Sequence, residues 1–128
     1  MLMQLKKSSD LSLQVLMFIA HLGPGQRTTA AAVAEALGAS KAHVAKVVST
    51  LASLQYLDSA KGRGGGIALM PDALDRSLGA LIRQLEQGEV VDCQACALSG
   101  ACGLRGHLAR AQEAFFASLD GVKIAEVV

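Results

Sequence analysis

The chain has 128 residues, enough for one domain of ordinary size but not for two. Its hydrophobic share is 52% with only 3% aromatic residues, and the apolar residues are mainly Ala, Leu and Val, a composition typical of helical proteins. The net charge is +1, but residues 1–70 carry seven Lys or Arg against three acids, whereas residues 71–128 carry five against eight. This asymmetry suggests that the first half meets a polyanion. No uncharged apolar run reaches the roughly 18 residues that span a bilayer, and no cleavage site follows the N-terminal apolar stretch, so we expect a cytoplasmic protein without a membrane segment.

The first predicted helix covers residues 8–22, where apolar residues recur at spacings of three and four. Ser8, Ser9 and Asp10 are expected to cap its start. The sequence Gly23-Pro24-Gly25 ends it.

A second and a third helix follow in quick succession. Thr28 and Thr29 open a short helix that Gly38 ends, and Ser40 then caps a third helix that runs to about Gln55. Two short helices joined by a turn of three or four residues with a glycine are typical of a helix-turn-helix, whose second helix enters the DNA major groove. The alternative is a plain helical hairpin with a solvated polar face.

The polar face of the third helix supplies the first candidate DNA-binding residues. Lys41 and His43 are expected to read base edges, and Lys46 to contact phosphate. Ser40 either contacts DNA or only caps the helix.

A β-hairpin is predicted next, with strands at residues 56–60 and 67–69 and a glycine-rich tip between them. A hairpin after the third helix makes a wing, in which Lys61 and Arg63 can reach phosphates or a minor groove. The GRGGG run lacks the spacing of a dinucleotide fingerprint, and no helix follows it.

A fourth helix is predicted from about Leu74 until Gly88 ends it, and a last helix from Leu104 to Leu119. The last helix carries an apolar stripe with spacings of three and four, which favours packing on a second copy of the chain. The expected fold is therefore mainly α with a small β-hairpin wing. Residues 1–71 form the winged helix-turn-helix DNA-binding region and residues 72–128 form the cysteine loop and dimerisation helices, in one compact domain.

The three cysteines, Cys93, Cys96 and Cys102, fall within ten residues as C-x2-C-x5-C. Clustered thiols in a reducing compartment favour metal or cluster ligation over a structural disulfide, with reversible thiol oxidation as the alternative.

The wing sequence KGRGGGIAL, followed by VVDC and GACGLRGHLARAQEAFFASLD, resembles the Rrf2 family of bacterial transcription regulators. The resemblance covers nearly the whole chain and is greatest to the nitric-oxide-sensing repressors of the family. It implies a homodimer with an iron-sulfur cluster on Cys93, Cys96 and Cys102. It also implies that the carboxylate of Asp10 supplies an exchangeable fourth ligand from the partner subunit.

Two departures qualify the resemblance. Other iron-sulfur regulators of the family use a histidine three residues after the last cysteine, where this chain has Arg105, and His107 would serve only with a shifted geometry. The family also has a longer spacing between its first two cysteines. A tight C-x2-C suits a 4Fe-4S cluster, a 2Fe-2S cluster or tetrahedral zinc, so the spacing does not choose among them.

These observations predict a repressor that binds a double-stranded DNA operator as a homodimer and whose iron-sulfur cluster senses nitric oxide or redox state. The alternative is a winged-helix repressor with a zinc or thiol-redox switch at the three cysteines. Electron transfer is disfavoured because C-x2-C-x5-C is not a ferredoxin spacing. An enzyme is not expected, because no catalytic set of residues appears at a usable spacing.

Overall fold

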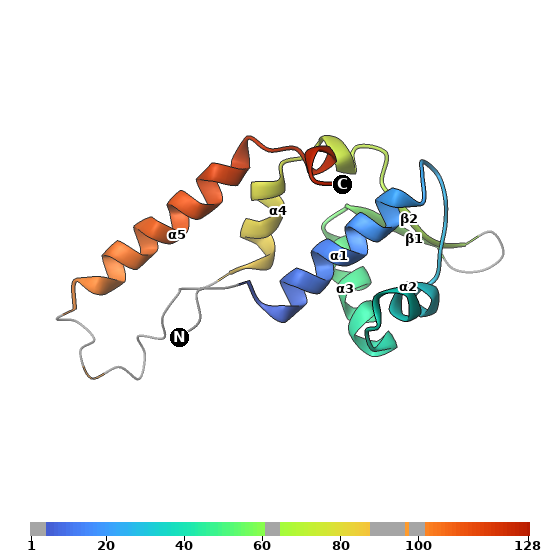
Figure 1. Ribbon diagram of the computed structural model, residues 1–128, viewed down its shortest axis with the longest axis horizontal. Helices are drawn as coiled ribbons and strands as arrows, with labels where there is room; N and C mark the ends of the chain where they lie inside the picture. Colours follow the sequence, from blue (N-terminus) through green and yellow to red (C-terminus); the bar gives the residue numbers. More distant parts are fainter. Residues whose placement is uncertain (1–4, 61–64, 88–96, 98–101) are drawn as a thin grey trace.

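Five α-helices, two short 3-10 helices and a two-stranded hairpin make up the part of the chain that a computed structural model describes, residues 5–60, 65–87, 97 and 102–128 (Figure 1). In chain order the elements are α1 (Lys7–His21), α2 (Ala30–Leu37), α3 (Lys41–Ser53), β1 (Leu57–Ala60), β2 (Gly66–Leu69), η1 (Ala73–Asp75), α4 (Leu78–Leu85), α5 (Leu104–Asp120) and η2 (Ile124–Glu126). The predicted fold class, mainly helical with a hairpin wing, is confirmed. In the described ranges every helix is too short or too polar to cross a bilayer.

The helix-turn-helix has the capping residues that the sequence analysis predicts. Thr29 accepts a hydrogen bond from the Ala32 amide at the start of α2, and Gly38 ends that helix in the left-handed conformation with φ +65°. Ser40 Oγ then accepts from the amide of His43, 3.1 Å away, and begins α3. A turn of only three residues therefore separates the two helices.

The wing is an antiparallel hairpin in which Leu57 pairs with Leu69 and Ala60 with Gly66. A third segment, which the sequence did not predict, joins it, because the amides and carbonyls of Thr28 and Ile67 exchange hydrogen bonds at 2.9 and 2.7 Å. Gly66 is needed at this junction. Its φ is +114°, and a Cβ there would lie 2.7 Å from the carbonyl oxygen of Thr28.

The start of α1 differs from its prediction. Lys6 occupies the N-cap position without a side-chain capping bond, and Ser8, Ser9 and Asp10 lie inside the first turn of the helix. The expected Ser-Ser-Asp cap is therefore wrong. The Lys6 amide instead donates to the Glu86 carboxylate at the end of α4, so a tertiary contact satisfies a group that a local cap would otherwise serve.

The predicted fourth helix is two helices. The apolar spacing is continuous from Leu74, but the chain breaks between η1 and α4 at Arg76 and Ser77. Ser77 caps α4 by accepting from the Ala80 amide, and it forms an antiparallel bridge with Lys123. Pairing with the C-terminal segment thus ends η1 early. The expected end at Gly88 lies outside the described residues, whereas the last helix confirms its prediction to within one residue.

One hydrophobic core joins the elements. It contains buried residues from α1, α2 and α3, the wing, η1, α4, α5 and η2, with Leu16, Leu51, Tyr56, Leu81 and Ile124 among the largest fully buried side chains. In Figure 1 the wing and the α2–α3 pair lie at one end of the molecule, whereas the start of α5 lies at the other.

Candidate functional site

The exposed face of α3 carries the polar residues expected to meet DNA. Val44, Val47, Val48 and Leu51 are buried against the core, whereas Ser40, Lys41, His43 and Lys46 are exposed. The four candidates therefore lie on the solvent-exposed side and at the N-terminal end of α3, whose opposite side packs against the core. The hydroxyl of Ser40 has a structural role as the helix cap.

A residue that the sequence reasoning missed holds the wing to the helix-turn-helix. Arg27, in the loop before α2, places Nη2 2.6 Å from Oδ2 of Asp58 on β1 and Nη1 3.1 Å from the carbonyl oxygen of Gly66 on β2. One guanidinium thus contacts both strands. Lys61 and Arg63, the predicted wing contacts, lie outside the described residues.

A second missed arginine supports the end of α3. Arg76 Nη1 donates to the carbonyl oxygens of Leu54 and Gln55, both at 3.1 Å, and its guanidinium carbon lies 3.6 Å from the centre of the Tyr56 ring. Tyr56 is fully buried, and this burial raises the pKa of its hydroxyl. The turn from α3 into the wing is therefore fixed by both a hydrogen-bonded cap and a cation–π contact.

The expected metal-binding residues are only partly described. Asp10 is exposed on the first turn of α1, and its carboxylate accepts a hydrogen bond from Gln14 Nε2 at 3.1 Å. Cys102 is exposed directly before α5, whose N-cap is Gly103. Cys93 and Cys96 lie outside the described residues, and among those described there is no group of three potential ligands.

The single chain does not bring Asp10 and Cys102 together. Figure 1 shows the start of α5 at the end of the molecule, away from the start of α1. The start of α1 instead lies against the end of α4, where Lys6 Nζ donates to the Gln87 carbonyl at 3.1 Å. One thiol and one carboxylate are nevertheless open to solvent, and sulfur and oxygen atoms can both ligate iron.

Comparisons with known proteins identify relatives of this chain. The profile of the Rrf2 family, described as iron-dependent transcriptional regulator, matches residues 5–128. The HTH-type transcriptional repressor NsrR of Streptomyces coelicolor is 41% identical over 131 residues, which span 98% of this chain and 88% of that protein. The HTH-type transcriptional regulator NsrR of Bacillus subtilis is 36% identical over 132 residues, with 98% and 90% covered.

Solved structures share the fold. Staphylococcus aureus CymR superposes with a TM-score of 0.71 at 22% identity over 95% of each chain. The structure titled T. potens IscR gives 0.71 at 19% identity over 98% of this chain and 85% of that one. At these identities the likeness establishes the winged-helix architecture.

Proposed function

Because the chain belongs to the Rrf2 family of iron-dependent transcriptional regulators, we propose that it is a repressor whose iron-sulfur cluster senses nitric oxide or redox state and controls operator binding. Its relatives are named as transcriptional regulators, so the expectation of a non-enzymatic protein is confirmed. One observation supports the proposal. The same fold exposes basic residues on α3 and, elsewhere on its surface, the thiol of Cys102 and the carboxylate of Asp10. The proposed place of action is the cytoplasm, where the DNA of bacteria such as those of the relatives lies.

The proposed DNA contacts follow from exposure and position. Lys41 and His43, near the N-terminal end of α3, are assigned to base edges, and Lys46, one turn further, to phosphate. Ser40 adds a contact from the start of the helix. Lys61 and Arg63 are assigned to the backbone beside the wing, whose base is held at the described strands by Arg27.

The proposed ligands are the thiolates of Cys93, Cys96 and Cys102 and the carboxylate of Asp10. When bound, the cluster supplies iron that reacts with nitric oxide. Cys102 precedes the N-terminus of α5, where the helix dipole favours negative charge, and its exposure leaves the sulfur accessible. The exposed carboxylate of Asp10 is a weaker ligand than a thiolate and is therefore the one that can be displaced.

The proposed dimer forms along α5. Phe116 is the one buried residue of this 17-residue helix, whereas Leu104 and Phe115 remain 54% and 47% exposed. A matching α5 from a second chain would cover these side chains. In such a dimer Asp10 of one subunit would complete the site of the other, which fits the separation of the starts of α1 and α5 within one chain.

The proposed division of labour assigns DNA binding to residues 1–71 and sensing and dimerisation to residues 72–128. Core side chains from both parts, including Leu51, Tyr56, Leu81 and Phe116, belong to one cluster, which supports a single cooperative domain.

The first test is an absorption spectrum of protein purified without oxygen, with iron and sulfide assayed on the same sample. A brown protein that bleaches with nitric oxide and then releases operator DNA supports the proposal. A colourless protein with stoichiometric zinc, or one with no metal and titratable thiols, overturns it in favour of a zinc or thiol switch.

The role of Asp10 has its own test. Asp10→Ala should weaken nitric-oxide-dependent release more than DNA binding by the cluster-loaded protein. Gln14→Ala is the matched control, since it removes the hydrogen bond to Asp10 and keeps the carboxylate. Equal loss of release and binding in Asp10→Ala would contradict the ligand role.

A further inference from the structure

The helix α5 is attached to the rest of the molecule near its C-terminal end. None of residues 104–112 is buried, and Leu108 and Gln112 are the only half-buried ones among them. Phe116, one turn later, is buried. The first half of α5 therefore extends from the body, as Figure 1 shows, and its direction is set by contacts made further along the helix.

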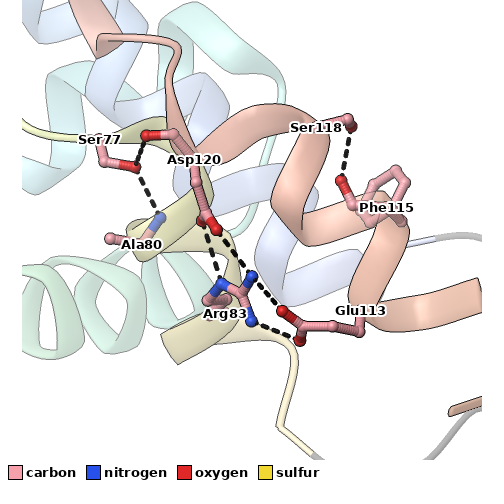
Figure 2. A network of polar contacts seen from close by, with 7 residues as sticks. All are labelled: Ser77, Ala80, Arg83, Glu113, Phe115, Ser118 and Asp120. Carbon is pink, nitrogen blue, oxygen red and sulfur yellow. Dashed lines mark hydrogen bonds and ion pairs between the residues drawn. The ribbon is translucent and has the colours of Figure 1, made fainter. Parts of the chain in front are cut away.

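The main polar contact is a fork made by one arginine (Figure 2). Arg83 of α4 pairs with both oxygens of Glu113, each at 2.7 Å, through its two terminal nitrogens. The same guanidinium reaches both oxygens of Asp120, with Nε 3.0 Å from Oδ1 and Nη2 2.7 Å from Oδ2. Only arginine has enough donors in one plane to bind two carboxylates in this way.

The spacing of the two carboxylates makes the fork a positional constraint. Glu113 and Asp120 are seven residues apart, which is about 10 Å along a helix. A single side chain that binds both therefore fixes the rotation of α5 about its axis as well as its slide along α4. The Phe116 ring lies between them in sequence and 5.2 Å from the Arg83 guanidinium carbon.

Close backbone packing holds the C-terminal end of α5. A Cβ on Gly79 would lie 2.5 Å from the backbone nitrogen of Asp120, so only glycine permits this approach. Ser77 Oγ donates to the Asp120 carbonyl at 2.8 Å while accepting from the Ala80 amide (Figure 2). Among the α5 residues of this network, Glu113 lies furthest from that fixed end, so its contact with Arg83 has the largest effect on the direction of α5.

We propose that Arg83 is the positioning residue that sets the direction of α5 relative to the winged-helix body, and thereby the spacing between the two DNA-reading α3 helices of a dimer. The inference rests on the proposed function, because it needs a dimer built along α5. A 17-residue helix is about 25 Å long, so a rotation of about 10° at the fixed end moves the other end by roughly 4 Å. Such a displacement is comparable to one base-pair step along DNA, about 3.4 Å.

The test measures how strictly the protein requires one operator spacing. Duplexes are selected from random DNA with the wild-type protein, and the spacer between their half-sites is then lengthened or shortened by one base pair. Wild-type affinity is expected to fall roughly tenfold for each change, because base contacts in one half-site lose their register. Arg83→Ala should lower this discrimination to about threefold or less, with binding to a single half-site unchanged.

Matched variants separate positioning from folding and from charge. Arg83→Lys keeps the charge without the fork and should resemble Arg83→Ala, whereas Asp75→Asn changes one charge outside the network and should resemble the wild type. If Arg83→Ala fails to fold, Glu113→Gln and Asp120→Asn each keep half of the fork and should give intermediate discrimination.

Undiminished spacing discrimination in folded Arg83 variants overturns the inference and leaves the proposed function intact. A wild-type protein that sediments as a monomer both free and on DNA overturns the proposed dimer, and the inference with it. The two failures are distinguished by the wild-type measurement alone.

Discussion

Arg27 Nη2 lies 2.6 Å from Asp58 Oδ2, so the loop before the helix-turn-helix is ion-paired to the first strand of the wing. The same guanidinium binds the second strand through the Gly66 carbonyl. The loop before α2 and both strands of the wing are thus held together by one side chain.

Arg27→Ala should loosen the wing while leaving the core intact. We expect DNA affinity to fall roughly three- to tenfold and its salt dependence to become shallower, because phosphate contacts from the wing lose their geometry. The free energy of unfolding should fall by only about 0.2–1 kcal/mol, since the ion pair is partly exposed. Fluorescence anisotropy at several salt concentrations tests this, with Asp58→Asn as the variant that removes only the charge. An unchanged salt slope would refute it.

Gln55→Gly should stabilise the protein. Gln55 has φ +66° at the end of α3, and its amide bonds to Ala52 while that of Tyr56 bonds to Leu51. The left-handed conformation costs a side-chain-bearing residue about 1–2 kcal/mol. Glycine's added freedom in the unfolded chain costs about 0.4–1 kcal/mol, so we expect a net gain of about 0.5 kcal/mol in urea unfolding.

Gly38→Ala is the converse experiment. Gly38 has φ +65° and no atom within 4 Å of an added Cβ, so the substitution tests conformation without steric contact. By the same two opposing terms, the free energy of unfolding should fall by about 0.5 kcal/mol. If Gln55→Gly and Gly38→Ala changed the free energy of unfolding in the same direction, the left-handed backbone conformation would not be the cause of both effects.

Ser9 and Ser12 provide a matched pair of buried hydroxyls on α1. Ser12 Oγ donates to the Ser8 carbonyl at 2.6 Å, whereas Ser9 Oγ has no hydrogen-bond partner among the described residues. Ser9→Ala removes an unsatisfied group and should leave stability unchanged or higher, while Ser12→Ala should lose about 0.5–1.5 kcal/mol. Thermal unfolding of both variants measures the difference, and a less stable Ser9→Ala would point to a partner for that hydroxyl.

The Arg83 fork should weaken in acid. Hydrogen bonds from Arg83 lower the pKa of both Glu113 and Asp120 below their ordinary values of 4.5 and 3.8. A carboxylate with a lowered pKa in the folded state contributes stability above its ordinary pKa and loses it as the pH falls through the folded value. We therefore expect the free energies of unfolding of the wild type and Arg83→Ala, measured in urea, to differ at about pH 6 and to converge as the pH falls to about 3. A constant difference would mean that the fork does not depend on carboxylate charge.

Local chemistry made most of the fold predictable. Thr29, Gly38 and Ser40 end or begin helices through interactions with neighbouring residues, and each was predicted from its position in the sequence. The wing strands followed from a change of hydrophobic period between glycines. The relatives likewise confirm the family that the wing and cysteine motifs indicated.

Long-range partners account for what the sequence did not reveal. Lys6 begins α1 because Glu86 accepts its amide from eighty residues away, and η1 stops because Ser77 pairs with Lys123. Arg27 and Arg83 look like ordinary surface arginines until the fold brings carboxylates to them. No spacing rule connects residues whose contact depends on how separate helices pack.

The exposed Cys102 lies at the start of α5, at the opposite end of the molecule from α3 and the wing. A DNA duplex held by α3 and the wing would not cover that end. DNA bound there would therefore not itself block a small diffusing molecule from a cluster held beside Cys102 while the protein is still on its operator. Derepression would then be timed by the arrival of the signal, and the protein would not first have to leave the DNA to become able to respond.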